Sequence, residues 1–225
     1  MPDGVRGRTV LIAGATSTSG LAAAHALTDA GALVIAVGRD TAKLDALAAA
    51  VPPARTAECD LGAEADVRAL ADTLRADGVR VDGILHLVGG WRGGGGLAGQ
   101  SDADYRALEV GLTALRHVTR AFWDGLLASD AARCAIVSST AVARPLAGGA
   151  NYAAVKAAEE AWARAMAQGF AKDARDEARE VRAASVVFRV RALAGLETVL
   201  AERFTGLWDA EAAAINDTVV QIDAA

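Results

Sequence analysis

Short apolar runs alternate with longer, alanine-rich amphipathic segments along almost the whole chain. The runs are rich in valine, isoleucine and leucine, which is typical of buried strands. They fall at residues 8–13, 32–37, 55–60, 83–88, 134–138, 183–190 and 218–222. The segments between them predict helices at 20–30, 41–51, 63–77, 102–129, 151–171, 197–204 and 209–215. Strands and helices that alternate in this way predict an α/β fold, with a parallel sheet covered by helices on both faces.

The length and the loops predict a single domain over residues 1–225. A chain of 225 residues without a repeat or a linker suits one sheet and one core. The least complex segment is Gly89-Gly-Trp-Arg-Gly-Gly-Gly-Gly96, which follows the predicted strand 83–88. Open α/β sheets bind ligands beyond strand ends, so this flexible segment is a candidate ligand loop, with an ordinary surface connection as the alternative.

A glycine- and hydroxyl-rich turn, Gly14-Ala-Thr-Ser-Thr-Ser-Gly20, joins the first predicted strand to the first predicted helix. Gly14 allows a tight turn, and Gly20 allows close approach to the helix start, where backbone amides bind a dinucleotide pyrophosphate. Four hydroxyl residues between them can donate further hydrogen bonds to phosphate: Thr16, Ser17, Thr18 and Ser19. The turn predicts a dinucleotide site, and a plain strand–helix connection is the alternative.

The end of the second predicted strand, Val37-Gly-Arg-Asp40, bears on the choice of dinucleotide. Arg39 suits the 2′-phosphate of NADP(H), whereas Asp40 would bind the 2′-hydroxyl of NAD(H). Arg39 is the better placed of the two, so we favour NADP(H), with NAD(H) possible. Alternatively, Arg39 is solvated and Asp40 caps the helix 41–51. Asp60 follows the third strand and is a candidate partner for the adenine amino group, or a helix cap.

Three residues form a candidate acid–base set. Tyr152 and Lys156 are four residues apart, so on a helix they share one face. An ammonium beside a phenol stabilises the phenolate, which lets the pair exchange a proton near neutral pH. Ser139 ends the predicted strand 134–138, where its hydroxyl can hydrogen-bond a substrate oxygen. The set suits protonation of a carbonyl oxygen or deprotonation of an alcohol, and an exposed helical pair is the alternative for the Tyr-x-x-x-Lys spacing.

These motifs occur in the order of a known family, and the chain resembles the short-chain dehydrogenase/reductase family over nearly its whole length. The matching pieces are Gly14…Gly20, Gly38-Arg39, Cys59-Asp60-Leu61, Leu87-Val88-Gly89-Gly90, Ser139 and Tyr152…Lys156. The resemblance implies a Rossmann-like doubly wound sheet, a nicotinamide cofactor and carbonyl/alcohol interconversion. It also implies that Tyr152 is the acid/base, that Ser139 orients the carbonyl and that Lys156 binds the nicotinamide ribose.

The same resemblance extends the expected cofactor site to Leu61, Val88, Gly89 and Gly90, and it includes Tyr152 and Lys156 in that site. It implies that substrate lies against a short C-terminal segment, about 191–213. It further implies a homodimer or homotetramer paired through the long helices at 102–129 and 151–171, whose many alanines permit close packing.

Several positions depart from the family pattern. Thr18 takes the place of the middle glycine, His86-Leu-Val-Gly89 replaces Asn-Asn-Ala-Gly, and Gly111 aligns with the asparagine that holds a relay water. We interpret His86 as a hydrogen-bonded core histidine, with a role in the site as the alternative.

The Pro-Gly after the sixth strand becomes Phe188-Arg189. Phe188, Arg189 and Trp91 are therefore candidate substrate residues, and strand packing and a solvated charge are the alternatives for the first two.

Composition and charge argue against several other classes of protein. The net charge is −5 and no basic block occurs, which argues against nucleic-acid binding. No apolar run reaches 18 residues, so no membrane span is expected. Cys59 and Cys134 are isolated, which predicts core thiols in a reducing compartment, no metal site and a cytoplasmic location.

The favoured hypothesis is an NADP-dependent carbonyl reductase or alcohol dehydrogenase that acts on a small molecule. The departures keep two others open. One is a related fold that catalyses a non-redox cyclisation, isomerisation or dehydration, and the other is a non-catalytic dinucleotide-binding partner.

Overall fold

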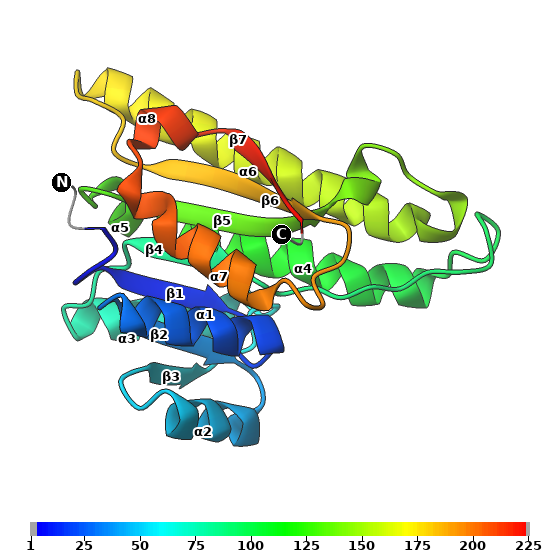
Figure 1. Ribbon diagram of the computed structural model, residues 1–225, viewed down its shortest axis with the longest axis horizontal. Helices are drawn as coiled ribbons and strands as arrows, with labels where there is room; N and C mark the ends of the chain where they lie inside the picture. The colour runs from blue at the N-terminus through cyan, green and yellow to red at the C-terminus, as the bar shows by residue number, and fades with distance from the viewer. Residues whose placement is uncertain (1–3, 224–225) are drawn as a thin grey trace.

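The computed structural model describes residues 4–223, which form one seven-stranded sheet in the order β3-β2-β1-β4-β5-β6-β7 (Figure 1). Every neighbouring pair in the sheet is parallel. The strands are β1 (Thr9–Ala13), β2 (Leu33–Gly38), β3 (Arg55–Glu58), β4 (Gly83–His86), β5 (Arg133–Ser139), β6 (Ala184–Val190) and β7 (Thr218–Ile222). The predicted doubly wound α/β fold is confirmed.

Helices cover both faces of the sheet (Figure 1). They are α1 (Thr18–Asp29), α2 (Thr41–Ala50), α3 (Glu64–Ala76), α4 (Asp102–Ala121), α5 (Trp123–Leu127), α6 (Ala150–Asp176), α7 (Glu197–Thr205) and α8 (Ala212–Ile215). Short 3-10 turns are η1 (Thr140–Val142), η2 (Ala147–Gly149) and η3 (Gly206–Asp209). No helix within residues 4–223 has the length and apolarity needed to cross a bilayer.

The central strand β1 divides the core into two layers. Val10 and Ile12 pack in the layer that includes α1 and α7, while Leu11 and Ala13 pack in the layer that includes α3, α4 and α6. This alternation follows from the two-residue period of a strand. Both layers are apolar, which is why the strand has no polar residue after Thr9. Each large side chain buried here contributes about 1.5–3 kcal/mol to folding.

The observed element boundaries differ most from the predicted ones in two helices. The helix expected over 102–129 is interrupted at Phe122, a core residue whose backbone (φ −104°, ψ 4°) leaves the helical region between α4 and α5. The helix expected over 151–171 runs five residues further, to Asp176. At α2 the cap is Asp40, whose side chain accepts a hydrogen bond from the Lys43 amide at 3.1 Å.

Candidate active site

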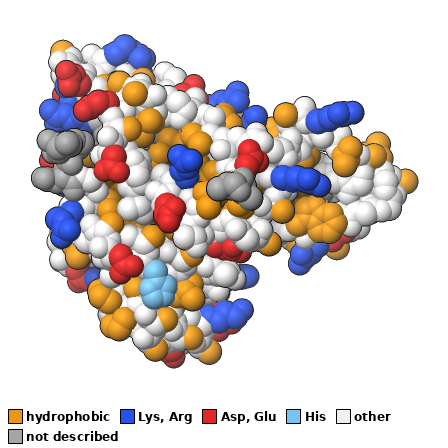
Figure 2. All heavy atoms as spheres, in the orientation of Figure 1, with side chains coloured by type: hydrophobic (Ala, Val, Ile, Leu, Met, Phe, Trp, Pro, Cys, Tyr) orange, Lys and Arg blue, Asp and Glu red, His pale blue; other side chains and the backbone are white. Residues whose placement is uncertain are grey.

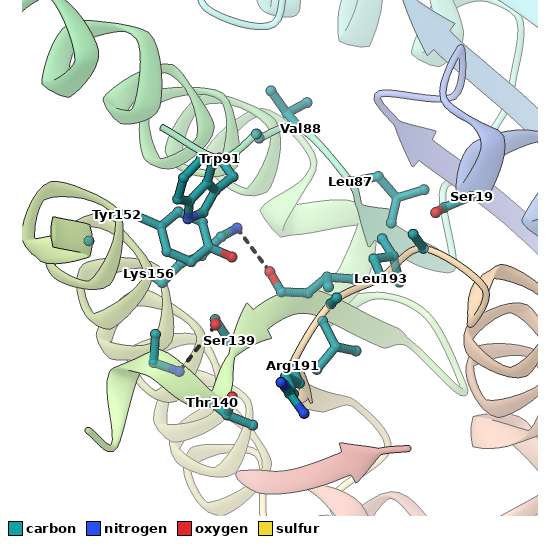
Figure 3. Close-up of a pocket in the computed structure, with 18 of the residues that line it drawn as sticks. Ser19, Leu87, Val88, Trp91, Ser139, Thr140, Tyr152, Lys156, Arg191 and Leu193 are labelled. Carbon is teal, nitrogen blue, oxygen red and sulfur yellow. Dashed lines mark hydrogen bonds between the residues drawn. The ribbon is translucent and has the colours of Figure 1, made fainter. Parts of the chain in front are cut away.

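The carboxyl ends of the central strands open into a cavity of about 1180 Å³ (Figure 3). A smaller cavity of about 320 Å³ adjoins it, since Ser17, Leu87, Val88 and Gly89 line both. The strand order reverses between β1 and β4, where doubly wound sheets bind their ligands.

The turn after β1 brings bare backbone to the cavities. Gly14 has φ +88°, and a Cβ there would lie 3.0 Å from the Val88 amide nitrogen. A Cβ on Gly20 would lie 2.2 Å from the Ala15 carbonyl oxygen. Ser17 caps α1, because its Oγ accepts from the Gly20 amide at 3.0 Å. The N-terminus of α1 is therefore held against the cavity wall, ready for an anion.

Three of the four predicted hydroxyl residues reach the cavities, and Thr18 does not. Ser17 and Ser19 line the larger cavity, and Thr16 and Ser17 line the smaller one. Thr18 is the first residue of α1 and is exposed, because the helix turns its side chain outward. Thr18 therefore stands apart from both cavities, and its contact with phosphate stays a prediction.

The close packing at Gly20 gives a first prediction. Replacing Gly20 with alanine forces the new Cβ into backbone, and overpacking of this kind costs about 1–3 kcal/mol. We expect Gly20→Ala to lower the melting temperature in calorimetry and to weaken NADPH binding. Gly125→Ala is the matched control, since its Cβ would meet nothing closer than 3.8 Å in helix α5. Equal melting temperatures for the two variants would contradict this account of the turn.

The smaller cavity carries two cations. Arg39 and Lys43 line it together with Asp60 and the predicted Leu61. Asp40 does not line it, because its carboxylate caps α2 and pairs with Lys43 Nζ at 3.5 Å. The hydrogen bond from the Lys43 amide lowers the pKa of Asp40. Lys43 was missed in the sequence, and its place in the first turn of α2 was the signal for it.

Asp60 makes a local hydrogen bond and also lines the smaller cavity. Its Oδ1 accepts from the Gly62 amide at 2.9 Å. The carboxylate therefore stabilises the turn after β3 and still borders the smaller cavity.

Ser139, Tyr152 and Lys156 line one wall of the larger cavity, from the end of β5 and the first turns of α6 (Figure 3). Ser139 Oγ accepts from the Ala141 amide at 3.1 Å, so its hydroxyl hydrogen can be donated into the cavity. Lys156 Nζ donates to the Val137 carbonyl at 2.9 Å and to Glu159 Oε2 at 2.7 Å. The sequence-predicted set is thus brought together on one cavity.

His86 lies at the end of β4 and also lines the larger cavity. It is 2% exposed, and its Nε2 lies 3.0 Å from the Gly111 carbonyl oxygen. Burial, aided by the charge of Lys156, lowers the pKa of His86 to about 3. The imidazole is therefore neutral near pH 7, and because a carbonyl only accepts, Nε2 carries the proton. The expected burial and hydrogen bond of His86 are confirmed, and its place in the cavity lining leaves the alternative of a role in the site open.

Phe188 and Arg189 do not line either cavity, so their predicted place beside the substrate is corrected. Phe188 is buried in the core layer of α1 and α7. Arg189 faces α6 and donates to both carboxylate oxygens of Glu160, at 2.8 and 2.6 Å. Both residues lie within β6, below its carboxyl end, and the cavity begins only at Val190.

The remaining lining comes from three loops. Gly90 and Trp91 follow β4, Arg144 and Leu146 follow β5, and residues 191–194 follow β6. The rest of the expected substrate segment packs elsewhere: Leu200, Phe204 and Trp208 are buried in the core layer of α1. Lys156 and two arginines line this cavity without any carboxylate, which the sequence did not reveal.

Comparison with known proteins fits this geometry. A model of the short chain dehydrogenase family matches residues 8–186. The chain belongs to the short-chain dehydrogenase family. It is by class an NAD(P)-dependent oxidoreductase. The chain has no significant sequence match among curated proteins.

Solved short-chain dehydrogenases share the whole fold at low sequence identity. One, from Shigella flexneri 2a in complex with NADP, is 21% identical with a TM-score of 0.84, over 98% of this chain and 99% of that one. A metagenomic short-chain oxidoreductase in complex with NADP is 23% identical with a TM-score of 0.83, over 98% and 99%. An NAD⁺-bound xylitol dehydrogenase is 16% identical with a TM-score of 0.83, over 97% and 98%.

Proposed function

We propose that this short-chain dehydrogenase is an NADP(H)-dependent carbonyl reductase, or an alcohol dehydrogenase in the reverse direction. The observation that carries the proposal is the placement of Ser139, Tyr152 and Lys156 on a cavity that adjoins the two-cation cavity. No observation comparably favours a non-redox reaction or a non-catalytic role.

The residues present fit a nicotinamide dinucleotide. Gly14 lines the smaller cavity and leaves bare backbone there, which suits close approach of a pyrophosphate. Arg39 and Lys43 would hold the 2′-phosphate of NADP(H). When bound, the cofactor supplies or accepts the hydride, and the protein supplies position and a proton.

Side chains of this protein can supply the proton that the carbonyl oxygen takes up during reduction. Ser139 donates its hydroxyl hydrogen to the carbonyl oxygen of the substrate. This hydrogen bond orients the carbonyl group in the cavity. Tyr152 donates the phenolic proton to the same oxygen as negative charge develops on it. Lys156 uses two of its three N–H groups on Val137 and Glu159, so the third can serve the cavity. Its ammonium stabilises the phenolate that remains.

The lining also suggests a substrate class. Trp91, Leu146 and Leu193 supply apolar surface, while Arg144 and Arg191 supply positive charge. A carbonyl compound with an apolar part and an anionic group fits this lining best. A screen for NADPH-linked turnover should therefore pair an oxo acid with its neutral ester.

We also propose that the protein forms a homodimer or homotetramer through α4 and α6, and that it is located in the cytoplasm.

Cofactor choice gives a second prediction. Arg39→Ala removes a charge-assisted contact worth about 1.5–3 kcal/mol, so NADPH affinity should fall about 10- to 150-fold. NADH affinity should change little, because NADH has no 2′-phosphate. Calorimetric titration of both cofactors measures this.

Two further variants control that titration. Arg68→Ala removes an exposed arginine of α3 that lies in neither cavity lining, and should leave both affinities unchanged. Asp40→Ala removes the cap of α2 and should cost about 0.5–2 kcal/mol of stability. An unchanged preference for NADPH in Arg39→Ala, or loss of NADH binding in Asp40→Ala, would count against the assignment.

A further inference from the structure

A buried carboxylate that no motif predicted lies directly behind the acid–base set. Glu159 is on α6, one helical turn after Lys156, and is 1% exposed. Its Oε2 accepts from Lys156 Nζ at 2.7 Å. Its Oε1 is buried and has no hydrogen-bond partner within residues 4–223. A buried carboxylate costs several kcal/mol unless it is paired, so its presence beside Lys156 requires an explanation.

Gly111 of α4 lies directly against this carboxylate. A Cβ on Gly111 would lie 2.7 Å from Glu159 Oε1 and 3.1 Å from the Val88 carbonyl oxygen. A side chain at position 111 and the carboxylate of Glu159 would therefore occupy the same space. Gly111 is also the position that aligns with the family's asparagine. The glycine at position 111 and the buried carboxylate of Glu159 are thus sterically coupled.

Few other charges act on this pair. Burial raises the pKa of Glu159, and Lys156 opposes that rise. From β4, His86 faces the same region and is neutral above about pH 3. From α4 the neighbour is Gly111, and from β5 it is the Val137 carbonyl. Glu160 is engaged on the other side with Arg189 and Ser138. Glu159 and Lys156 therefore form a nearly isolated buried ion pair.

We propose that Glu159 is a positioning residue that fills the space beside Gly111 and binds Lys156 from there. It holds the ammonium of Lys156 behind Tyr152 and offsets part of that ammonium's charge. Its effect on catalysis rests on the proposed function, whereas its effect on the ionisation of Tyr152 does not.

The charge of Glu159 should be measurable at Tyr152. Glu159→Gln keeps the shape and an oxygen acceptor but removes the negative charge, so the ammonium stabilises the phenolate more strongly. Because Coulomb energies over several ångströms reach one or two kcal/mol at a partly buried site, the midpoint of phenolate formation should fall by about one pH unit.

The chain offers a clean optical test, because it has only two tyrosines, Tyr105 and Tyr152. Tyr105 is 42% exposed on α4 and lines neither cavity. In a Tyr105→Phe background, ultraviolet titration of phenolate absorbance reports Tyr152 alone and needs neither cofactor nor turnover. We expect Tyr105→Phe/Glu159→Gln to titrate at lower pH than Tyr105→Phe. Equal midpoints would overturn the proposal, even if the enzyme reduces carbonyls.

Substitutions at positions 111 and 159 test whether the two side chains compete for the same space. Gly111→Asn alone should lower stability and turnover, because the asparagine meets Glu159 Oε1. Gly111→Asn/Glu159→Ala should recover at least about tenfold in turnover over Gly111→Asn, since the two positions share one space. Additive losses in the double variant would overturn the proposal. Absence of NADPH-linked turnover in the wild-type protein would count against the proposed function instead.

Discussion

Tyr152→Phe is expected to reduce turnover by about 10²–10⁴-fold, because the variant keeps the ring but cannot deliver a proton to the carbonyl oxygen. NADPH affinity should stay within about twofold of the wild-type value, since only the phenolic oxygen is removed. Steady-state rates of NADPH oxidation and calorimetric titration of the cofactor measure the two effects separately.

Tyr105→Phe is the matched control for this experiment. The same hydroxyl is removed, but from an exposed residue of α4 outside the cavity lining. Its turnover should equal that of the wild-type protein. Full turnover in Tyr152→Phe would rule out the proposed proton donor, whatever the control shows.

Lys156→Met should lose both activity and stability. The activity falls because no ammonium stabilises the phenolate of Tyr152. The free energy of unfolding falls by about 3–5 kcal/mol, because Glu159 is left buried without its partner. Chemical denaturation and steady-state rates measure the two losses.

The stability loss should depend on pH in a definite direction. The folded pKa of Glu159 is already raised by burial, and loss of Lys156 removes the charge that opposes the rise. A group with a raised folded pKa favours folding at acid pH, and that contribution is lost as the pH rises. The deficit of Lys156→Met should therefore be larger near pH 8 than near pH 5. A deficit independent of pH would contradict the ion-pair account.

A double variant separates the two losses. Lys156→Met/Glu159→Leu replaces the buried pair with apolar side chains of similar size, a change that is often neutral or stabilising. Stability should return while turnover stays low. If turnover also returned, Lys156 would not belong to the acid–base set.

The fold could be predicted from the sequence because the inner strands β1 and β4 are buried on both faces and are therefore mostly apolar. The apolar run at β1 predicts the burial of this strand, and the glycines that follow it predict the tight turn into α1. The set of Ser139, Tyr152 and Lys156 was also predictable, because a helix period and a strand end place them at one edge of the sheet.

The rest of the site depends on tertiary contacts that no local pattern contains. Phe188 and Arg189 were predicted to face the substrate, but β6 extends to Val190 and keeps both below the cavity. Glu159 looks like an ordinary helical carboxylate in the sequence, and only the packing of α4 on α6 shows that it fills the space beside Gly111. Arg144 and Arg191 reach the cavity through loops whose course has no sequence code.

The most direct test of the central claim is the ratio of NADPH oxidised to alcohol formed, measured on the wild-type protein with a carbonyl substrate found in the screen. Absorbance would follow the cofactor and chromatography would follow the product. The account predicts one NADPH oxidised for each alcohol formed, with both signals lost in Tyr152→Phe. Product formed without oxidation of NADPH would contradict it and would assign the cavity to non-redox chemistry.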